Sequence, residues 1–483
     1  MEIGKISLEE IDVKTEQVNR LSQILEDYKN QKELQLNQLM DRDIDNLEIA
    51  QMLKEHPIMD EKLPYKDKYL NVLEYFVRKY SADDIWANAV LRLYKEKILG
   101  DLQNYNYRER EVFKQSKNVV ATKFKPFRFF SYRYCLIFDC IFMNAIGDKG
   151  KGEKIYTELS SIYHKRYKKK IRQVFDALYD IRISLDGFEQ INYMAECWKK
   201  NMEYQSQKLS KVLVTANMSA GKSTLLNAIV GKKINKTQND ACTAKNHYIL
   251  NKAFEDELIY ELDGLLDLRA SKQVLMDDNE DNLSNYIAVG VRFRNIRDYR
   301  RRIWFIDTPG VNSSQDIVHK EISEHAIKEC EYDTLLYVLN SQNIGTDDDR
   351  KHMEYVAQNY KGRTIFLINK LDTFRTKDDS VNETLECVKR DVKDIGFKNA
   401  IVYPISAYAA YLSKMHFYGE DLNEDEVDEL EYFYRKMKKE EFNFEKYYPV
   451  EFDEYDNIIS DKDKELMLHS GILSLEKVLM QGE

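Results

Sequence analysis

Proline and glycine are scarce in the first 200 residues, and the cysteines have neither metal-site spacing nor the pattern of a disulfide framework. The 483 residues include only 6 prolines and 17 glycines, so helices there meet few breaks. No C-x-x-C pair occurs, and no group of histidines lies near a cysteine. We therefore expect reduced, buried thiols and a cytoplasmic protein. The cysteines are Cys135, Cys140, Cys197, Cys242, Cys330 and Cys387.

The sequence also lacks a signal peptide and an apolar run long enough to cross a bilayer. Met1–Gly4 contains an acidic residue and does not begin a basic region followed by an apolar one. The most apolar segment, Tyr134–Ile146, is too short to span a membrane and contains Asp139, so it predicts a buried helix. The formal net charge of -10 makes a general nucleic-acid partner unlikely to be the target.

The hydrophobic pattern changes near residue 205. Before it, apolar residues recur at helical spacing, as in 6–25 and 69–77, and further helices are expected in 155–183 and 188–209. After it, short apolar runs alternate with helical stretches, which is typical of a mainly parallel sheet covered on both faces. The runs are 212–214, 303–306, 335–339, 364–368 and 401–403. We predict an all-α domain over 1–205 and an α/β domain over 206–483.

A phosphate-binding loop is predicted at the first of these runs. Lys211–Thr215 is expected to form a strand and Leu225–Val230 a helix that Gly231 can cap, with a loop between them, which is the order of a P-loop. Loop amides bind phosphate oxygens, Lys222 can bridge the β and γ phosphates, and Ser223 can bind Mg²⁺. The expected nucleotide-binding residues are Asn217, Met218, Ser219, Ala220, Gly221, Lys222, Ser223 and Thr224.

The loop departs from the usual pattern at one position. Ala216 stands where the first glycine is usual, and an alanine fits there if its φ is negative. Gly221 lets the main chain approach the phosphates closely. Because a variant motif alone can arise by coincidence, the assignment depends on the other motifs.

A second motif follows the run 303–306. Asp307 can hold Mg²⁺ through water, and Gly310 can offer its amide to the γ-phosphate, so this loop can sense hydrolysis. The same residue types also occur in a plain strand-to-turn junction. The motif therefore supports a nucleotide site only in combination with the others.

Two more motifs predict the base that is bound. Asp372, in the run that begins with Asn369, can accept hydrogen bonds from the guanine N1–H and 2-amino groups, and adenine lacks this donor pair. The stem of Lys370 can cover the base, and an amide of Ser406 or Ala407 can meet the guanine carbonyl oxygen. Since every one of these loops follows a predicted strand, all are expected at the edge where open α/β sheets bind ligands.

Together these motifs resemble the GTPase domain of the dynamin family, in its bacterial dynamin-like branch. The resemblance covers roughly 208–483 and is carried by 218–228, Ala241–Ala244, Asp307–Gly310 and Asn369–Asp372, with 469–476 resembling the start of the last helix of the domain. It implies an α/β P-loop GTPase domain that uses GTP as substrate and Mg²⁺ as cofactor. Residues 1–205 carry no such resemblance.

The resemblance also implies residue roles. Thr243 is the expected switch threonine, so the Mg²⁺ ligands would be Ser223, Thr243 and Asp307, and the catalytic residues Lys222, Thr243 and Ser219. Ser219 keeps a position that helps to bind K⁺ or Na⁺ in the family. Met218 stands where eukaryotic dynamins carry glutamine, and a thioether cannot orient the attacking water, so slow hydrolysis or water held by backbone groups is expected. GTP-bound domains are expected to pair face to face, which stimulates hydrolysis.

Two further segments are departures or insertions. Dynamins continue after this domain into long helices, so a stalk is expected from 1–205 or from a second dynamin-like chain. An acidic insertion at about 423–464, rich in aromatics, is expected to be a solvent-facing helical excursion, and 277–281 a solvated loop or helix cap.

The stretch 101–175 is basic, with 17 Lys and Arg against 7 Asp and Glu. Its basic segments, Lys123–Arg133 and Lys165–Arg172, could contact an anionic membrane surface, which would make the protein peripheral at a membrane. RNA or an acidic partner, or simply a solvated helix face, would suit the same residues.

Three functions are compatible with the sequence. The first is a dynamin-like GTPase that hydrolyses GTP to GDP and phosphate, with turnover stimulated by assembly. The second is a GTP-binding regulatory subunit with little turnover, which Met218 would allow. The third is a structural subunit of a hetero-oligomer with a longer dynamin-like chain.

Overall fold

The computed structural model describes most of the chain after residue 56. The described residues are 53, 56–100, 105, 107, 128–161, 163–180, 182–188, 191–217, 219–234, 246–252, 255, 257–263, 265–271, 286–294, 301–310, 317–374, 380–452, 458 and 460–480. By their contacts they form two compact units, with the division between Ser184 and Leu185. None of the helices in this part of the chain is long and apolar enough to cross a membrane.

The division precedes helix α9 (Asn192–Gln205), whereas the hydrophobic pattern suggested a boundary after it. Near the end of α9, the Tyr204 hydroxyl donates to the carbonyl oxygens of Asn251 at 3.0 Å and Arg301 at 2.9 Å, both in the second unit. Helical spacing shows that α9 has a buried face, but it does not show which neighbours cover that face.

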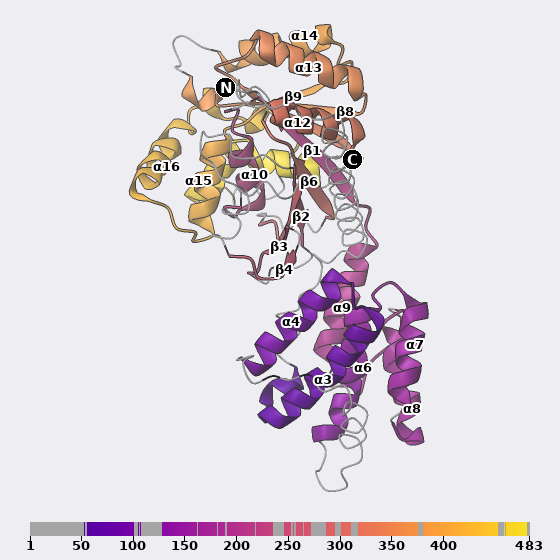
Figure 1. Ribbon diagram of the computed structural model, residues 1–483. Helices are drawn as coiled ribbons and strands as arrows, with labels where there is room; N and C mark the ends of the chain where they lie inside the picture. Colours follow the sequence, from indigo (N-terminus) through magenta and orange to yellow (C-terminus); the bar gives the residue numbers. More distant parts are fainter. Residues whose placement is uncertain are drawn as a thin grey trace, which may run out of the picture. The chain divides into compact units, whose positions relative to one another are not determined.

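The first unit is helical, as predicted. Its elements are η2 (Pro57–Asp60), α3 (Leu63–Tyr80), α4 (Ile85–Leu99), α6 (Arg128–Asn144), α7 (Lys149–Ser160) and α8 (Lys165–Ala177) (Figure 1). The stripe predicted over 69–77 is the buried face of α3, and the apolar segment 134–146 is buried mainly in α6. Asp139 of α6 is fully buried and accepts hydrogen bonds from the hydroxyls of Tyr69, at 2.6 Å, and Tyr94, at 3.1 Å. The stripe predicted over 6–25 lies outside the described residues.

The second unit is built on a nine-stranded sheet with the order β4-β3-β5-β2-β6-β1-β7-β8-β9. The five predicted runs form β1 (Ser210–Ala216), β6 (Ile303–Asp307), β7 (Thr334–Asn340), β8 (Arg363–Asn369) and β9 (Ile401–Pro404), which are parallel. The remaining strands are β2 (Asn246–Asn251), β3 (Tyr260–Asp263), β4 (Leu265–Asp267) and β5 (Tyr286–Val291). Because β2 pairs antiparallel with β6, the sheet is mixed but mainly parallel, as predicted.

Helices cover both faces of this sheet (Figure 1). The set α12 (Ile317–Glu329), α13 (Asp347–Asn359) and α14 (Val381–Ile395) packs together, and so does the set α10 (Lys222–Val230), α15 (Ala407–Phe417), α18 (Lys462–His469) and α19 (Ile472–Met480). In the second set, Lys414 of α15 forms a fully buried ion pair with Glu476 of α19 and donates to the Ile229 carbonyl of α10 at 3.1 Å. This pair connects three helices behind the nucleotide loops.

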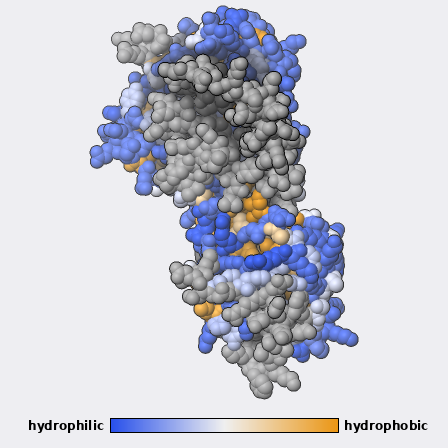
Figure 2. Space-filling view, viewed as in Figure 1, coloured by the Kyte–Doolittle hydropathy of each residue, from blue (hydrophilic) through white to orange (hydrophobic). Residues whose placement is uncertain are grey.

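The acidic insertion is not merely a solvent-facing excursion, so that expectation is corrected. Its helix α16 (Glu424–Lys436) exposes acidic residues to a mainly hydrophilic surface (Figure 2). The other face inserts Leu430, Phe433 and Tyr434 into the core, and η4 (Glu440–Phe442) adds Phe442. The many aromatics of this segment are therefore core residues, because burying their large apolar area stabilises the packing against α15 and α18.

Two buried side chains of α13 have opposite pKa shifts. Burial raises the pKa of Asp349 from 3.8 to about 6, although the Thr346 hydroxyl beside it acts in the other direction. Burial lowers the pKa of His352 from 6.5 to about 4, and Lys320 contributes in the same direction. The His352 ring is held by a 3.0 Å hydrogen bond between its Nε2 and the Thr215 hydroxyl of β1.

These shifts predict opposite effects of pH in two variants. Folded Asp349 keeps its proton to higher pH than the unfolded residue, so its contribution to stability falls as pH rises from about 4 to about 6. Folded His352 loses its proton at lower pH, so its contribution falls as pH drops from 6.5 to about 4. Relative to wild type, the unfolding free energy of Asp349→Asn should increase over this pH range and that of His352→Asn should decrease, each by at most about 3 kcal/mol. Urea denaturation at both ends of the range measures this, and differences of the same sign in both variants would contradict it.

Candidate functional site

The P-loop predicted after β1 has the backbone conformation of a phosphate cradle. Gly221 precedes α10 with φ 88°, in the left-handed region, and a Cβ there would lie 2.4 Å from the Asn369 amide nitrogen. Only glycine fits this position, because a side chain would be both strained and in collision. Ala216 lies in β1 and does not have a positive φ, so its backbone tolerates alanine as expected. Gly231 caps α10 with φ 76°, and its amide donates to the Asn227 carbonyl.

Lys222 and Asp307 form a buried ion pair at the centre of the site. Lys222, at the start of α10, is 8% exposed, and Asp307, at the end of β6, is fully buried. Burial raises the pKa of the Asp307 carboxyl, and the Lys222 ammonium partly counteracts that rise. Since two buried charges are stable only when each is compensated, ligands that part this pair must supply a phosphate for the lysine and a cation for the carboxylate.

Asn369 joins three of the predicted loops. Its amide nitrogen donates to the Ala220 carbonyl of the P-loop at 2.8 Å, and its side-chain oxygen accepts from the Ala407 amide at 3.0 Å. The Ser406 amide is in turn bonded to the Ser470 carbonyl at 3.0 Å. One side chain at the end of β8 therefore holds the phosphate loop and the loop after β9 in register.

Asp372 occupies a nearly closed position beside Ser406. It lies in the short helix η3 (Leu371–Thr373), is 9% exposed, and follows Lys370, whose φ is 66°. Burial raises the pKa of Asp372, while the Ser406 hydroxyl and the charges of Lys436 and Lys370 act to lower it. A buried carboxylate without a full set of partners suits a ligand that presents two hydrogen-bond donors.

Ser219 is held in an unusual conformation at the outer side of the P-loop. It is exposed and has φ 59°, which is uncommon for a residue other than glycine and marks local strain. The Asn340 side chain, at the end of β7, reaches its carbonyl oxygen at 3.5 Å. The sequence analysis did not identify Asn340, although a polar residue directly after the run 335–339 follows the same strand-end rule as Asp307 and Asn369.

The other predicted site residues are placed less completely. Asn217, Ser223, Thr224 and Gly310 are half-buried in the same loops. Met218 and Thr243 lie outside the described residues, as do 277–281 and the side chains of 123–132. The structure therefore brings together the phosphate, base and aspartate motifs, and the roles of Met218 and Thr243 stay predictions.

Comparison with known families identifies this unit. Residues 212–371 match the dynamin family. The second unit carries a dynamin-like GTPase domain. The matched segment contains Lys222, Asp307 and Asn369, and the mainly parallel sheet confirms the predicted α/β P-loop fold. Domains of this family take GTP as substrate, typically with Mg²⁺.

The similarity to individual proteins is lower. The chain is 23% identical over 208 residues to a probable transmembrane GTPase, FZO-like, chloroplastic, of Arabidopsis thaliana, covering 42% of this chain and 20% of that protein. A structure of Aquifex aeolicus Era bound to GDP.AlF4- matches 45% of this chain and 59% of that chain, with 19% identity and a TM-score of 0.27. A structure of an oligomerised bacterial dynamin pair covers 87% and 74%, with 16% identity and a TM-score of 0.34. The chain thus spans about a fifth of the length of the curated relative.

The residues present fit a magnesium nucleotide. The donor set is the Asp307 carboxylate with the Ser223 hydroxyl, and oxygen ligands of this kind suit Mg²⁺. The close approach of Gly221 to Asn369 leaves the loop backbone without a side chain at the point where phosphates would lie. Bound Mg²⁺ would neutralise phosphate charge during phosphoryl transfer.

Proposed function

We propose that the chain binds GTP with Mg²⁺ in this site and hydrolyses it to GDP and phosphate, with turnover that rises on self-association. The supporting observation is the way in which Asn369 joins the P-loop to the Ser406–Ala407 loop, beside the Lys222–Asp307 pair. Phosphate binding would transfer Lys222 from Asp307 to the β and γ phosphates, and Asp307 would then face the cation.

The remaining roles follow from position. The Asp372 carboxylate would accept from the guanine N1–H and 2-amino groups, Lys370 would cover the base, and the Ala407 or Ser406 amide would meet its carbonyl oxygen. Gly310 would contact the γ-phosphate, and Ser223 and Thr243 would complete the Mg²⁺ ligands. These assignments are those that the sequence motifs predicted.

Self-association is proposed because the domain lacks an evident cation at the site of charge development other than Lys222. Ser219 is exposed, with its backbone in the left-handed region, where its oxygens could help to hold K⁺ or Na⁺ once a partner covers the loop. The partner would be a second copy or a related dynamin-like chain. Positive charge placed there stabilises the transition state of phosphoryl transfer.

Contact with an anionic membrane surface is part of the same proposal. Five basic residues near the start of α8 are exposed, although positive charge at a helix N-terminus is unfavourable to the helix. An anionic surface would offset that cost and attract the basic residues. The residues are Lys165, Arg166, Lys168, Lys169 and Lys170.

One experiment tests these elements together. GTP turnover per molecule should rise with protein concentration, rise further with anionic vesicles, and be higher in K⁺ or Na⁺ than in a large organic cation. Ser219→Leu should reduce the dependence on concentration and leave GDP binding intact. If the rate per molecule stays constant and light scattering shows no dimer with a GTP transition-state mimic, the GTP-binding regulatory subunit becomes the better assignment.

A further inference from the structure

The acidic insertion reaches the loop that is proposed to bind the base. Lys436, the last residue of α16, donates from its Nζ to the Phe374 carbonyl at 3.2 Å. Phe374 caps η3, the short helix that contains Asp372. The Lys436 charge also acts to lower the pKa of Asp372, against the effect of burial. An insertion outside the nucleotide motifs thus contacts the base loop through a hydrogen bond and through charge.

The Lys436 side chain is itself held in place. Its ammonium lies 4.7 Å from the centre of the Phe442 ring and 5.5 Å from that of the Tyr432 ring. Phe442 is 2% exposed and belongs to the core of the GTPase unit. Cation–π contacts with fixed rings restrict a long side chain that otherwise has many rotamers, so less entropy is lost when it holds the loop.

The helix that carries Lys436 is fixed to the elements behind the site. The Tyr434 hydroxyl donates to one carboxylate oxygen of Asp463 at 2.5 Å, and the other oxygen lies 2.8 Å from Nδ1 of His416. Asp463 belongs to α18, and His416 to α15, the helix that starts at the Ser406–Ala407 loop. The end of α16 is therefore anchored to the same helix that presents the second base-facing loop.

The opposite side of the base loop has its own contacts. The Gln342 side chain, after β7, donates to the Thr373 hydroxyl at 3.3 Å, and that hydroxyl donates to the Lys370 carbonyl at 2.7 Å. With these bonds on one side, Lys436 supplies the contact from the insertion. Loss of Lys436 would free the Phe374 end of the loop while leaving the Lys370 end held.

We propose that Lys436 is a positioning residue for guanine recognition, which holds η3 so that the Asp372 carboxylate meets the base. This inference rests on the proposed function, because it assumes that Asp372 binds guanine. The Lys436 charge has a second effect, since a nearby cation favours the ionised carboxylate that accepts both hydrogen bonds. Lys436 does not touch the phosphates in this arrangement, so it should affect binding of the base alone.

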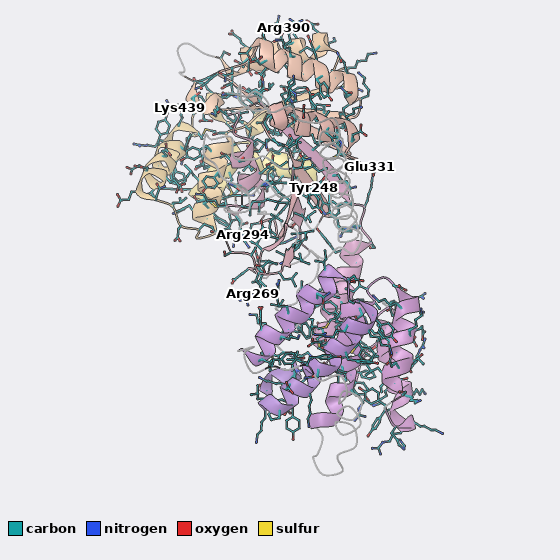
Figure 3. All side chains as sticks on the ribbon, viewed as in Figure 1. Tyr248, Arg269, Arg294, Glu331, Arg390 and Lys439 are labelled. Carbon is teal, nitrogen blue, oxygen red and sulfur yellow. The ribbon has the colours of Figure 1, made fainter. Side chains whose placement is uncertain are left out.

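The test compares Lys436→Met, Lys436→Arg and the control Lys439→Met in the full chain. Methionine keeps an apolar stem over the rings and removes the charge and the donor, whereas arginine keeps both. Lys439 is exposed on the same segment (labelled in Figure 3), so its replacement removes an equal charge. Affinities for Mg²⁺-GDP, ADP and inorganic triphosphate are measured by calorimetry or competition, and thermal unfolding confirms that each variant is folded.

Lys436→Met should weaken GDP binding about tenfold, the effect of one charge-assisted hydrogen bond, and leave the affinity for inorganic triphosphate unchanged. The pH at which GDP affinity declines should also move upward, because Asp372 loses a neighbouring cation. Lys436→Arg and Lys439→Met should bind GDP like the wild type.

Several outcomes would overturn the inference. One is unchanged GDP binding in Lys436→Met, and another is an equal loss of affinity for GDP and inorganic triphosphate, which would indicate a general effect on folding. A loss of the same size in Lys439→Met would show that only net charge matters. If the wild type itself binds ADP as tightly as GDP, the proposed function fails first, and this result is separate from those of the variants.

Discussion

Replacing Lys222 with alanine is expected to abolish tight binding of GTP. The phosphates would lose the one lysine of the P-loop, a loss of about 3 kcal/mol or more, which is roughly a hundredfold or greater in affinity. The nucleotide-free protein should also become less stable, because Asp307 would stay fully buried without the charge that now compensates it. Calorimetric titration with Mg²⁺-GTP and thermal unfolding measure the two effects separately.

Lys232→Ala is the matched control. Lys232 is also a buried lysine in an ion pair, with Glu255 at 3.0 Å, and it lies just beyond the C-terminal end of α10. Its loss should reduce stability but leave GTP affinity intact. Unchanged affinity in Lys222→Ala would refute the assignment of the P-loop, whatever its effect on stability.

Replacing Asp372 with asparagine is expected to change base selectivity. The variant loses one acceptor for the guanine donors, which should weaken GTP by about 1–3 kcal/mol. Its new amide donor matches the 2-carbonyl of xanthine, so xanthine nucleotides should bind more tightly than GTP. Competition between GTP, xanthosine triphosphate and ATP at equal Mg²⁺ measures the change. Binding of ATP by the wild type as tight as that of GTP would rule out the role of Asp372.

A pH series gives a second readout for Asp372. Because burial raises the pKa of its carboxyl, wild-type GTP affinity should already fall at a pH above the ordinary range for aspartate, as the group takes up a proton and stops accepting. The Asp372→Asn variant should lack this dependence. Asp349→Asn, which alters another buried carboxyl of the same unit, should keep the wild-type preference for GTP.

The five central strands were predictable because each is a continuous apolar run buried on both faces. Strands β3, β4 and β5 were not predicted. Among these, β5 (Tyr286–Val291) is fully buried, but it lies in a long stretch between motifs, where a short apolar run does not distinguish a strand from part of a helix. Its pairing with β2 also depends on residues far away in sequence, and propensity does not show which strands become neighbours.

The site divides in the same way. Lys222, Asp307, Asn369 and Asp372 were predictable because phosphate, Mg²⁺ and guanine each require a particular side-chain type at the end of a strand. Lys436 was not, since one lysine in a charged helix gives no signal until the chain brings it to the Phe374 carbonyl. The aromatics of the insertion gave a signal that was misinterpreted, because an acidic composition suggests solvent, whereas only the inward face of α16 determines burial.

The sequence by itself determined the class of fold, the order of the nucleotide motifs and the residue types that can bind phosphate and guanine, because these depend on local periodicity and on short-range chemistry. Only the tertiary structure decided that α9 packs with the GTPase unit, that Lys414 and Glu476 form a buried pair, and that the insertion braces the base loop. Such contacts join residues far apart in the chain. Their free energy arises from burial and charge compensation after folding, so no local pattern of residues encodes them.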